Sequence, residues 1–152
     1  MKRKAFTLVE VLVVVVVIGV LAAMVVPKFA NAQADARVAA TAEDLRLMEV
    51  AIGMYYTKTG KYPADIYYKL MPIGLAPYFK TDNPFAKPVP IGGMYDYEGT
   101  PGWSPVQISI RPDGASAHTD ADALELDEFI DDGNLSTGSL RRDGTRTYFI
   151  IE

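Results

Sequence analysis

The feature that most constrains the fold is an apolar run of 21 residues from Phe6 to Val26, in which only Thr7 and Glu10 are strongly polar. At about 1.5 Å per residue, a helix of this length is roughly 31 Å long, close to the hydrocarbon thickness of a bilayer. Five consecutive valines (13–17) disfavour a helix in water. In lipid, however, every backbone amide must be satisfied within the segment, which enforces a helix. We therefore predict a transmembrane helix.

Charges beside the run predict its orientation. Lys2, Arg3 and Lys4 precede it, and basic residues at one end of a membrane helix stay on the cytoplasmic side. The chain after the run is then expected on the opposite side of the membrane. An ordinary secretory signal peptide is the alternative, because Ala30-Asn31-Ala32 has the small-residue pattern of a cleavage site.

Glu10 is the unusual residue of this segment. A charge at membrane depth costs about 2.5–3.5 kcal/mol even on permissive insertion scales. A plain anchor does not need such a residue, so the sequence predicts a partner for Glu10 within the bilayer. Alternatively, Glu10 lies at the membrane interface and reaches water.

Beyond Pro27 the chain remains helical in pattern but becomes amphipathic. Pro27 removes an amide donor, and we expect a kink there. Apolar residues then recur at spacings of three, four and seven: Val38, Leu45, Met48, Ile52 and Tyr55 or Tyr56. Gly60 and Pro63 are stop signals, so the helix should end near Thr59.

The remainder of the chain predicts an α+β fold, with the long helix packed on a small antiparallel sheet. Residues 60–93 are rich in Pro, Gly and Tyr and are expected to form a connecting loop, with one short helix near 65–71. Strands are expected at 93–97, 106–110 and 147–151. A short helix is expected at 121–130, with Leu124 and Phe129 or Ile130 facing inward.

The basic leader, the stretch Phe6-Thr7-Leu8-Val9-Glu10, the apolar run and Pro27 together resemble the N-terminus of type IV pilins and type II secretion pseudopilins. The resemblance implies that a prepilin peptidase cuts between Ala5 and Phe6 and methylates the new amine of Phe6. One departure is Ala5, where the family usually has Gly. The chain has no cysteine, and the missing disulfide favours the pseudopilin branch, closest to the major pseudopilin.

By this resemblance, the chain divides into a leader (1–5), a transmembrane and assembly half of the helix (6–27) and a periplasmic pilin-like domain (28–152). Within the domain we expect an amphipathic helix (28–59), a connecting loop (60–93), and a sheet with C-terminal loops (94–152). In a filament, the carboxylate of Glu10 would meet the amine of Phe6 on a neighbour, and the pair would set the assembly register.

The expected function is that of a structural subunit of a type II secretion pseudopilus, which polymerises from the inner membrane into a periplasmic filament that helps export proteins. Implied partners are other copies, minor pseudopilins, the prepilin peptidase, the inner-membrane assembly platform and, before assembly, membrane lipid. Two alternatives are a type IV pilus subunit for adhesion, motility or DNA uptake, working through loops around Trp103 or residues 120–132, and a membrane-anchored periplasmic binding module that never polymerises.

Acidic residues gather late in the chain and suggest a calcium site, because Ca²⁺ takes several carboxylate and carbonyl oxygens on a flexible loop. The candidate ligands are Asp127, Asp131 and Asp132. The spacing is not that of an EF-hand, but Asp131-Asp132-Gly133-Asn134 is similar in chemistry to the C-terminal calcium loop of major pseudopilins. The alternative is a solvated acidic surface without a metal, and no other cofactor is expected.

Other function classes are disfavoured. Without the leader the chain has 12 cations against 19 anions, a net of −7, which disfavours nucleic-acid binding. The one histidine, His118, lies in a polar stretch and is expected to be exposed rather than catalytic. Because no cysteine nucleophile and no phosphate-loop, dinucleotide-binding or zinc motif is present, we expect no enzyme.

Overall fold

The computed structural model describes residues 6–79, 83–99, 105–114 and 116–151. The chain divides into two compact units, 1–36 and 37–152, which are described separately. The predicted leader (1–5), including Ala5, lies outside the described residues, as does Trp103.

Helix α1 (Leu8–Thr59) confirms the long N-terminal helix. Its assignment runs through Pro27 without a break, so the kink expected there stays a prediction. In the first unit, every large hydrophobic side chain from Phe6 to Phe29 is exposed. Among the described residues, α1 is the helix that is long and apolar enough to cross a membrane.

In the second unit, α1 buries one face. The residues predicted to face inward are buried, namely Val38, Leu45, Met48 and Ile52, and Ala42 joins them. Tyr55 is partly buried against this core, whereas Tyr56 is exposed. The helix ends as expected, with Gly60 at φ 70°, the left-handed conformation that suits a glycine after a helix.

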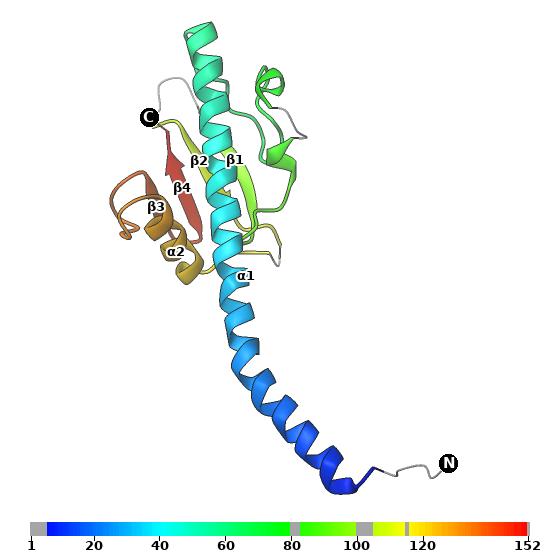
Figure 1. Cartoon of the computed structure of the whole chain (residues 1–152). Helices are drawn as coiled ribbons and strands as arrows, with labels where there is room; N and C mark the ends of the chain where they lie inside the picture. Colours follow the sequence, from blue (N-terminus) through cyan, green and yellow to red (C-terminus); the bar gives the residue numbers. More distant parts are fainter. Residues whose placement is uncertain (1–5, 80–82, 100–104, 115, 152) are drawn as a thin grey trace. The chain divides into compact units, whose positions relative to one another are not determined.

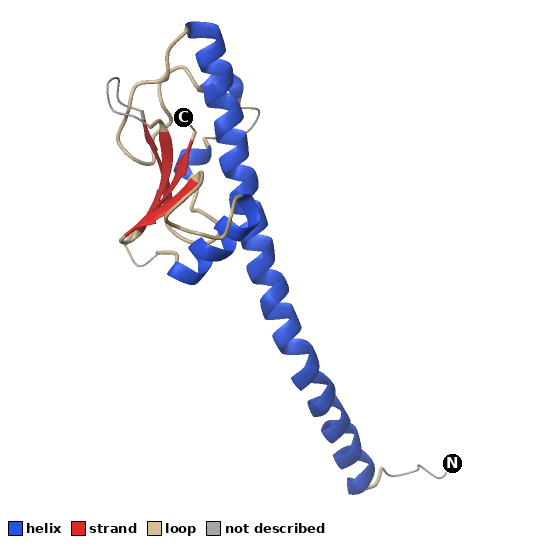
Figure 2. Cartoon of the chain, turned by 90° about the vertical axis from the view of Figure 1, so that its left-hand side faces the viewer, coloured by secondary structure: helices blue, strands red, loops and turns tan. Residues whose placement is uncertain are grey.

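Four antiparallel strands form the sheet, in the order β1-β2-β4-β3. They are β1 (Met94–Glu98), β2 (Gln107–Arg111), β3 (Leu140–Asp143) and β4 (Arg146–Ile150). The three predicted strands are therefore confirmed to within one residue at each end, while β3 is an addition. Figure 1 shows the strands behind the second half of α1, and Figure 2 shows this part of the helix on one face of the sheet.

The core lies between that helix and the sheet. Alternate strand residues supply its other side, as in a half-buried antiparallel sheet: Tyr95, Tyr97, Ile108, Ile110 and Phe149. Two single turns of 3₁₀ helix follow in the connecting segment, η1 (Ala76–Tyr78) and η2 (Pro84–Ala86). Leu75, just before η1, and Phe85, within η2, join the core.

The connecting segment departs from one expectation. The short helix expected near 65–71 is wrong: the chain turns at Tyr67–Leu70, where the Leu70 amide donates to the Tyr67 carbonyl over 3.2 Å. Lys69 sits at φ 68° within this turn. That left-handed conformation cannot continue a right-handed helix.

Helix α2 (Asp120–Ile130) confirms the second predicted helix. Its inward face was predicted incorrectly, except for Ile130, which packs on the core. Leu124 and Phe129 are exposed, whereas Ala123, Leu126 and Asp127 are buried. The buried residues and Ile130 follow the spacing of one helix face, so docking against β3 selected a face that includes an aspartate.

Candidate assembly end and metal site

Glu10 has a partner within its own helix. Its Oε2 atom accepts hydrogen bonds from the amide and the hydroxyl of Thr7, each over 2.8 Å. The Glu10 amide in turn donates to Thr7 Oγ1 over 3.2 Å. This reciprocal arrangement is a capping box, which satisfies amides at a helix start and places a carboxylate at its positive end.

Sequence reasoning missed this role of Thr7, although the spacing Thr-x-x-Glu is the signal for a capping box. The cap explains how a single chain holds Glu10 beside an apolar helix. It does not use the whole carboxylate, because both hydrogen bonds from Thr7 go to Oε2. Glu10 and Phe6 are both exposed, so each is accessible to a neighbouring molecule.

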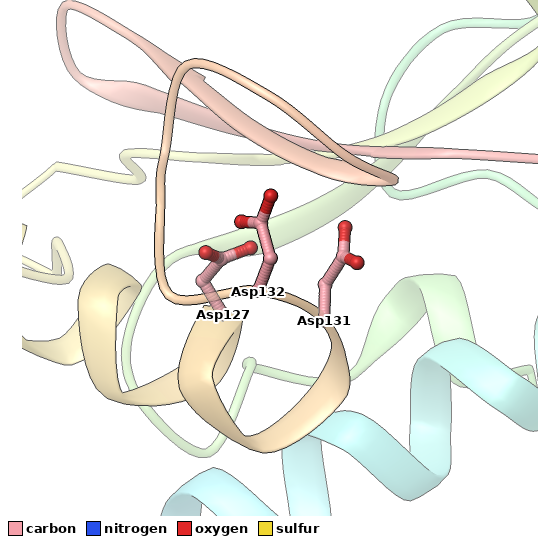
Figure 3. Close-up of side chains that lie close together, drawn as sticks. All are labelled: Asp127, Asp131 and Asp132. Atoms are coloured by element: carbon pink, nitrogen blue, oxygen red, sulfur yellow. The ribbon is translucent and has the colours of Figure 1, made fainter.

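The three aspartates predicted as metal ligands come together at the end of α2. One carboxylate oxygen from each of Asp127, Asp131 and Asp132 lies within 4.8 Å of the others. Figure 3 shows the three side chains projecting to the same side of the helix end. Asp127 comes from the last turn of α2, and Asp131 and Asp132 come from the start of the loop to β3.

Asp127 differs from its two neighbours because it is completely buried. Among the described residues, no close and well-aligned donor reaches either of its carboxylate oxygens, and the amides of Asn134 and Gly133 are only weak partners. Burial raises the pKa of Asp127, and the charges of Asp132 and Asp131 raise it further, while the amides of Asn134 and Gly133 lower it. A buried carboxylate without a strong partner is costly, and a cation bound at this point would offset that cost.

The other two carboxylates shape the loop. Asp131 Oδ2 accepts from the amide and hydroxyl of Ser139, which lowers the Asp131 pKa. Asp132 accepts from the Asn134 amide over 2.9 Å and from the Thr137 hydroxyl over 2.8 Å. Gly138 sits at φ 72°, and a Cβ there would collide with the Asp131 carboxylate. The loop backbone therefore passes close to the acidic cluster.

The donor set fits a hard divalent cation. It offers three carboxylates, one of them buried and only weakly hydrogen-bonded, next to a loop whose carbonyls are further oxygen donors. No histidine or cysteine belongs to this cluster, so the softer transition metals are disfavoured.

His118 is buried, not exposed as its polar neighbours in the sequence suggested. Its Nε2 atom lies 2.7 Å from Thr147 Oγ1 and 2.6 Å from an Arg142 guanidinium nitrogen. Because arginine only donates, Nε2 must accept, which leaves the imidazole proton on Nδ1. Burial and the charge of Arg142 lower the His118 pKa to about 4. Arg142 also pairs with Asp120 at 2.7 Å, so this cluster ties the start of α2 to β3 and β4.

The overall fold identifies the class of protein. The structure is similar to that of the major type IV pilin PilA1 from Clostridium difficile, with a TM-score of 0.53 and 19% identity, covering 78% of this chain and 96% of the pilin. At that identity the likeness shows a pilin-like fold. Residues 1–26 match the family described as the prokaryotic N-terminal methylation motif.

Sequence relatives give the particular family. The chain is 32% identical to type II secretion system core protein G of Pseudomonas aeruginosa over 139 residues, covering 80% of this chain and 92% of that protein. Core protein G of Klebsiella pneumoniae is 37% identical over 62 residues, 41% of this chain. The corresponding Escherichia coli protein is 39% identical, also over 62 residues. The chain belongs to the core protein G family, the major pseudopilins.

Proposed function

We propose that this chain is a structural subunit of a type II secretion pseudopilus and performs no catalysis of its own. The observation that best supports this proposal is the exposed apolar start of α1. This segment is capped at Glu10 and is joined in sequence to a pilin-like domain. The large hydrophobic side chains described from Phe6 to Phe29 are exposed in the isolated chain. Lipid covers them in the membrane-resident subunit, and neighbouring helices cover them in the filament.

Glu10 determines the register of this assembly. In the single chain its carboxylate is held by Thr7. When a peptidase has cut between Ala5 and Phe6, the new amine of a neighbour supplies a full positive charge. Two opposite charges in a low-dielectric helix bundle are each costly alone and attract strongly together. Subunits whose charges meet are therefore favoured over subunits shifted along the filament axis.

Location and partners follow from the same proposal. The subunit waits in the inner membrane with its N-terminus cytoplasmic and its domain periplasmic, and it then joins the filament. It works with the prepilin peptidase, the assembly platform and minor pseudopilins. The relatives named type II secretion core protein G and the methylation motif support this proposal.

Charge at Glu10 can be tested separately from its capping role. E10Q keeps a residue that can complete the capping box but loses the charge, whereas T7A loses the cap and keeps the charge. We expect E10Q to abolish filaments, measured by shearing and electron microscopy, while the subunit still fractionates with membranes. E43Q, at an exposed acid of the same helix, is the matched control and should assemble normally. Normal filaments from E10Q would contradict the proposed register.

We also propose that the aspartate cluster binds Ca²⁺ through Asp127, Asp131 and Asp132. Bound calcium would neutralise the buried Asp127 and fasten the end of α2 to the loop before β3. The support is the buried, only weakly hydrogen-bonded Asp127 carboxylate beside two further carboxylates.

Thermal unfolding of the full chain in detergent tests the calcium site through two comparisons of stability. Wild type should gain stability on adding CaCl₂, by about 2.7 kcal/mol at a hundredfold excess over Kd. D127N should be more stable than wild type without calcium, because it removes a buried unpaired charge, yet it should gain nothing from calcium. D143N, at an exposed acid on β3, should respond like wild type. An unchanged calcium response in D127N would overturn this assignment.

A further inference from the structure

A second concave site lies beside β1 and β2, away from the features discussed so far. It is an open cavity of about 390 Å³ lined by Asp65, Ile66, Tyr67, Tyr68, Asp96 and Arg111. The first four residues belong to the connecting segment, and the last two come from the strands β1 and β2. Neither the fold nor the proposed assembly requires a hollow here.

Three of the lining residues, Tyr68, Asp96 and Arg111, are called here the inner half of the cavity. Together they form a complete recognition unit for a guanidinium group. Arg111 donates to Asp96 Oδ2 over 2.8 Å, and its Cζ atom lies 4.7 Å from the centre of the Tyr68 ring. Asp96 is buried at 7% exposure. One arginine therefore pairs with a carboxylate and stacks on a tyrosine, the two contacts that a planar guanidinium makes together.

The outer half, which consists of Asp65 and Tyr67, offers the same two groups, a carboxylate and a tyrosine ring. Asp65 is exposed, and Tyr67 is 72% exposed, with its ring centre 4.7 Å from that of Tyr68. Among the described residues, no cation lies over the Tyr67 ring and none forms an ion pair with Asp65. The nearby ammonium of Lys69 pairs with Asp113 at 2.8 Å instead.

The backbone holds Tyr67 in this exposed position. Lys69 adopts a left-handed φ of 68°, which disfavours a residue with a Cβ. The ion pair with Asp113 and the contact of the Lys69 ammonium with the Tyr68 ring, 5.1 Å from its centre, fasten the turn despite this cost. Tyrosine is a residue type enriched at the energetic centres of protein interfaces, and a fixed backbone reduces the freedom that it loses on binding.

We propose that the outer half of this cavity binds an arginine side chain presented by another protein. The bound guanidinium would stack on Tyr67 and pair with Asp65, repeating the arrangement of Arg111, Tyr68 and Asp96. Charge favours this occupant: Arg111 pairs with Asp96 and Lys69 pairs with Asp113, so among the described residues Asp65 is the lining carboxylate without an ion pair. A cation is therefore attracted and an anion repelled. Arginine is preferred to lysine because only a planar group stacks and pairs at once. The proposal stands whether or not the chain polymerises.

The test is a titration of the full-length protein in detergent micelles with the peptide acetyl-Gly-Arg-Gly-amide, followed by NMR. We expect saturable shifts at Asp65 and Tyr67 with a Kd in the millimolar range, at about −4 kcal/mol. The citrulline peptide, which has the same shape without the charge, should produce none. D65N and Y67L should each weaken arginine binding about two- to fivefold. Y67F, which keeps an aromatic face, should bind as wild type does.

D143N serves as the matched acidic control, because β3 is at the opposite edge of the sheet from β1. Its binding should be unchanged. Equal shifts from the arginine and citrulline peptides would overturn the proposal. So would unchanged affinity in both D65N and Y67L, or shifts confined to other acidic surfaces. Circular dichroism of each variant separates lost binding from lost folding.

Discussion

The two units of this chain differ in where their apolar side chains find partners. In the first unit, α1 presents large hydrophobic residues on every side, and those described from Phe6 to Phe29 are all exposed. In the second unit, the same helix has a buried face, and residues such as Leu45, Met48 and Ile52 have no exposed surface. The second unit therefore supplies its own core, whereas the first unit needs lipid or other helices.

The acidic groups show the opposite contrast. Glu10, in the exposed unit, is satisfied by Thr7. Asp127, in the folded unit, is buried, and among the described residues its carboxylate has only weak contacts with the amides of Asn134 and Gly133. In the first unit an apolar helix surface lies exposed, and in the second unit a single buried carboxylate lacks a strong partner. Burial alone therefore does not identify the groups that bind a ligand or a partner.

The largest expected effect distinguishes two leucines of the same helix. L45A should destabilise the domain by about 2–5 kcal/mol, because it removes a fully buried side chain and leaves a cavity. L12A changes a residue that is 53% exposed in the first unit and should leave domain unfolding unchanged. Chemical denaturation in detergent measures both. Equal effects would contradict the division into two units.

Acid should destabilise the second unit through His118. Because burial and Arg142 lower its folded pKa to about 4, the unfolded chain binds more protons between about pH 6.5 and 4. Stability should therefore fall by about 2–3 kcal/mol as the pH drops through that window. Asp122 and Asp120 favour the charged form and moderate the loss. H118Q should flatten this part of the denaturation profile, and an unchanged profile would refute the buried neutral imidazole.

Alanine substitutions at two glycines distinguish the cost of backbone strain from the cost of a steric collision. G138A should cost about 2–3 kcal/mol, because φ is 72° and the new Cβ would displace Asp131 from Ser139. G144A, with φ 58° and open space around it, should cost only the strain, about 1 kcal/mol. Thermal unfolding compares them. Equal costs would mean that the approach of the loop to Asp131 is unimportant.

Each unit also has a capping box, which permits a matched comparison of smaller effects. Thr119 caps α2: its hydroxyl accepts from the Asp122 amide over 3.1 Å, and its amide donates to Asp122 Oδ2 over 2.7 Å. T119A should destabilise the domain by about 1 kcal/mol. T7A removes the equivalent cap in the first unit and should leave domain unfolding unaffected, while amide exchange at the start of α1 accelerates. Slow exchange there in T7A would contradict the Thr7–Glu10 cap.

Local pattern predicted the long helix, its end and three strands, because each depends on a run of neighbouring residues. Strand β3 was not predicted: in Leu140-Arg141-Arg142-Asp143 only the first residue is apolar, and pairing with β4 supplies the rest. No helix forms at 65–71, where Lys69 adopts a left-handed conformation and pairs with Asp113, 44 positions along the chain. Such contacts leave no local signal.

The candidate site was likewise predictable from the sequence only in part. Asp127, Asp131 and Asp132 were identified because acidic residues gather late in the chain and because Asp131-Asp132-Gly133-Asn134 is similar in chemistry to the calcium loop of major pseudopilins. The burial of Asp127 could not be predicted, since it depends on how α2 docks on the sheet. His118 was predicted to be exposed because its neighbours are polar, whereas its partners Arg142 and Thr147 come from distant strands.

A high-resolution electron cryomicroscopy structure of the assembled fibre would show the surroundings of Glu10. The proposed register predicts that the carboxylate of Glu10 lies within about 4 Å of the amine of Phe6 on a neighbouring subunit, inside a water-free bundle of α1 helices. A fibre in which Glu10 faces water and bonds only to Thr7 of its own chain would contradict it.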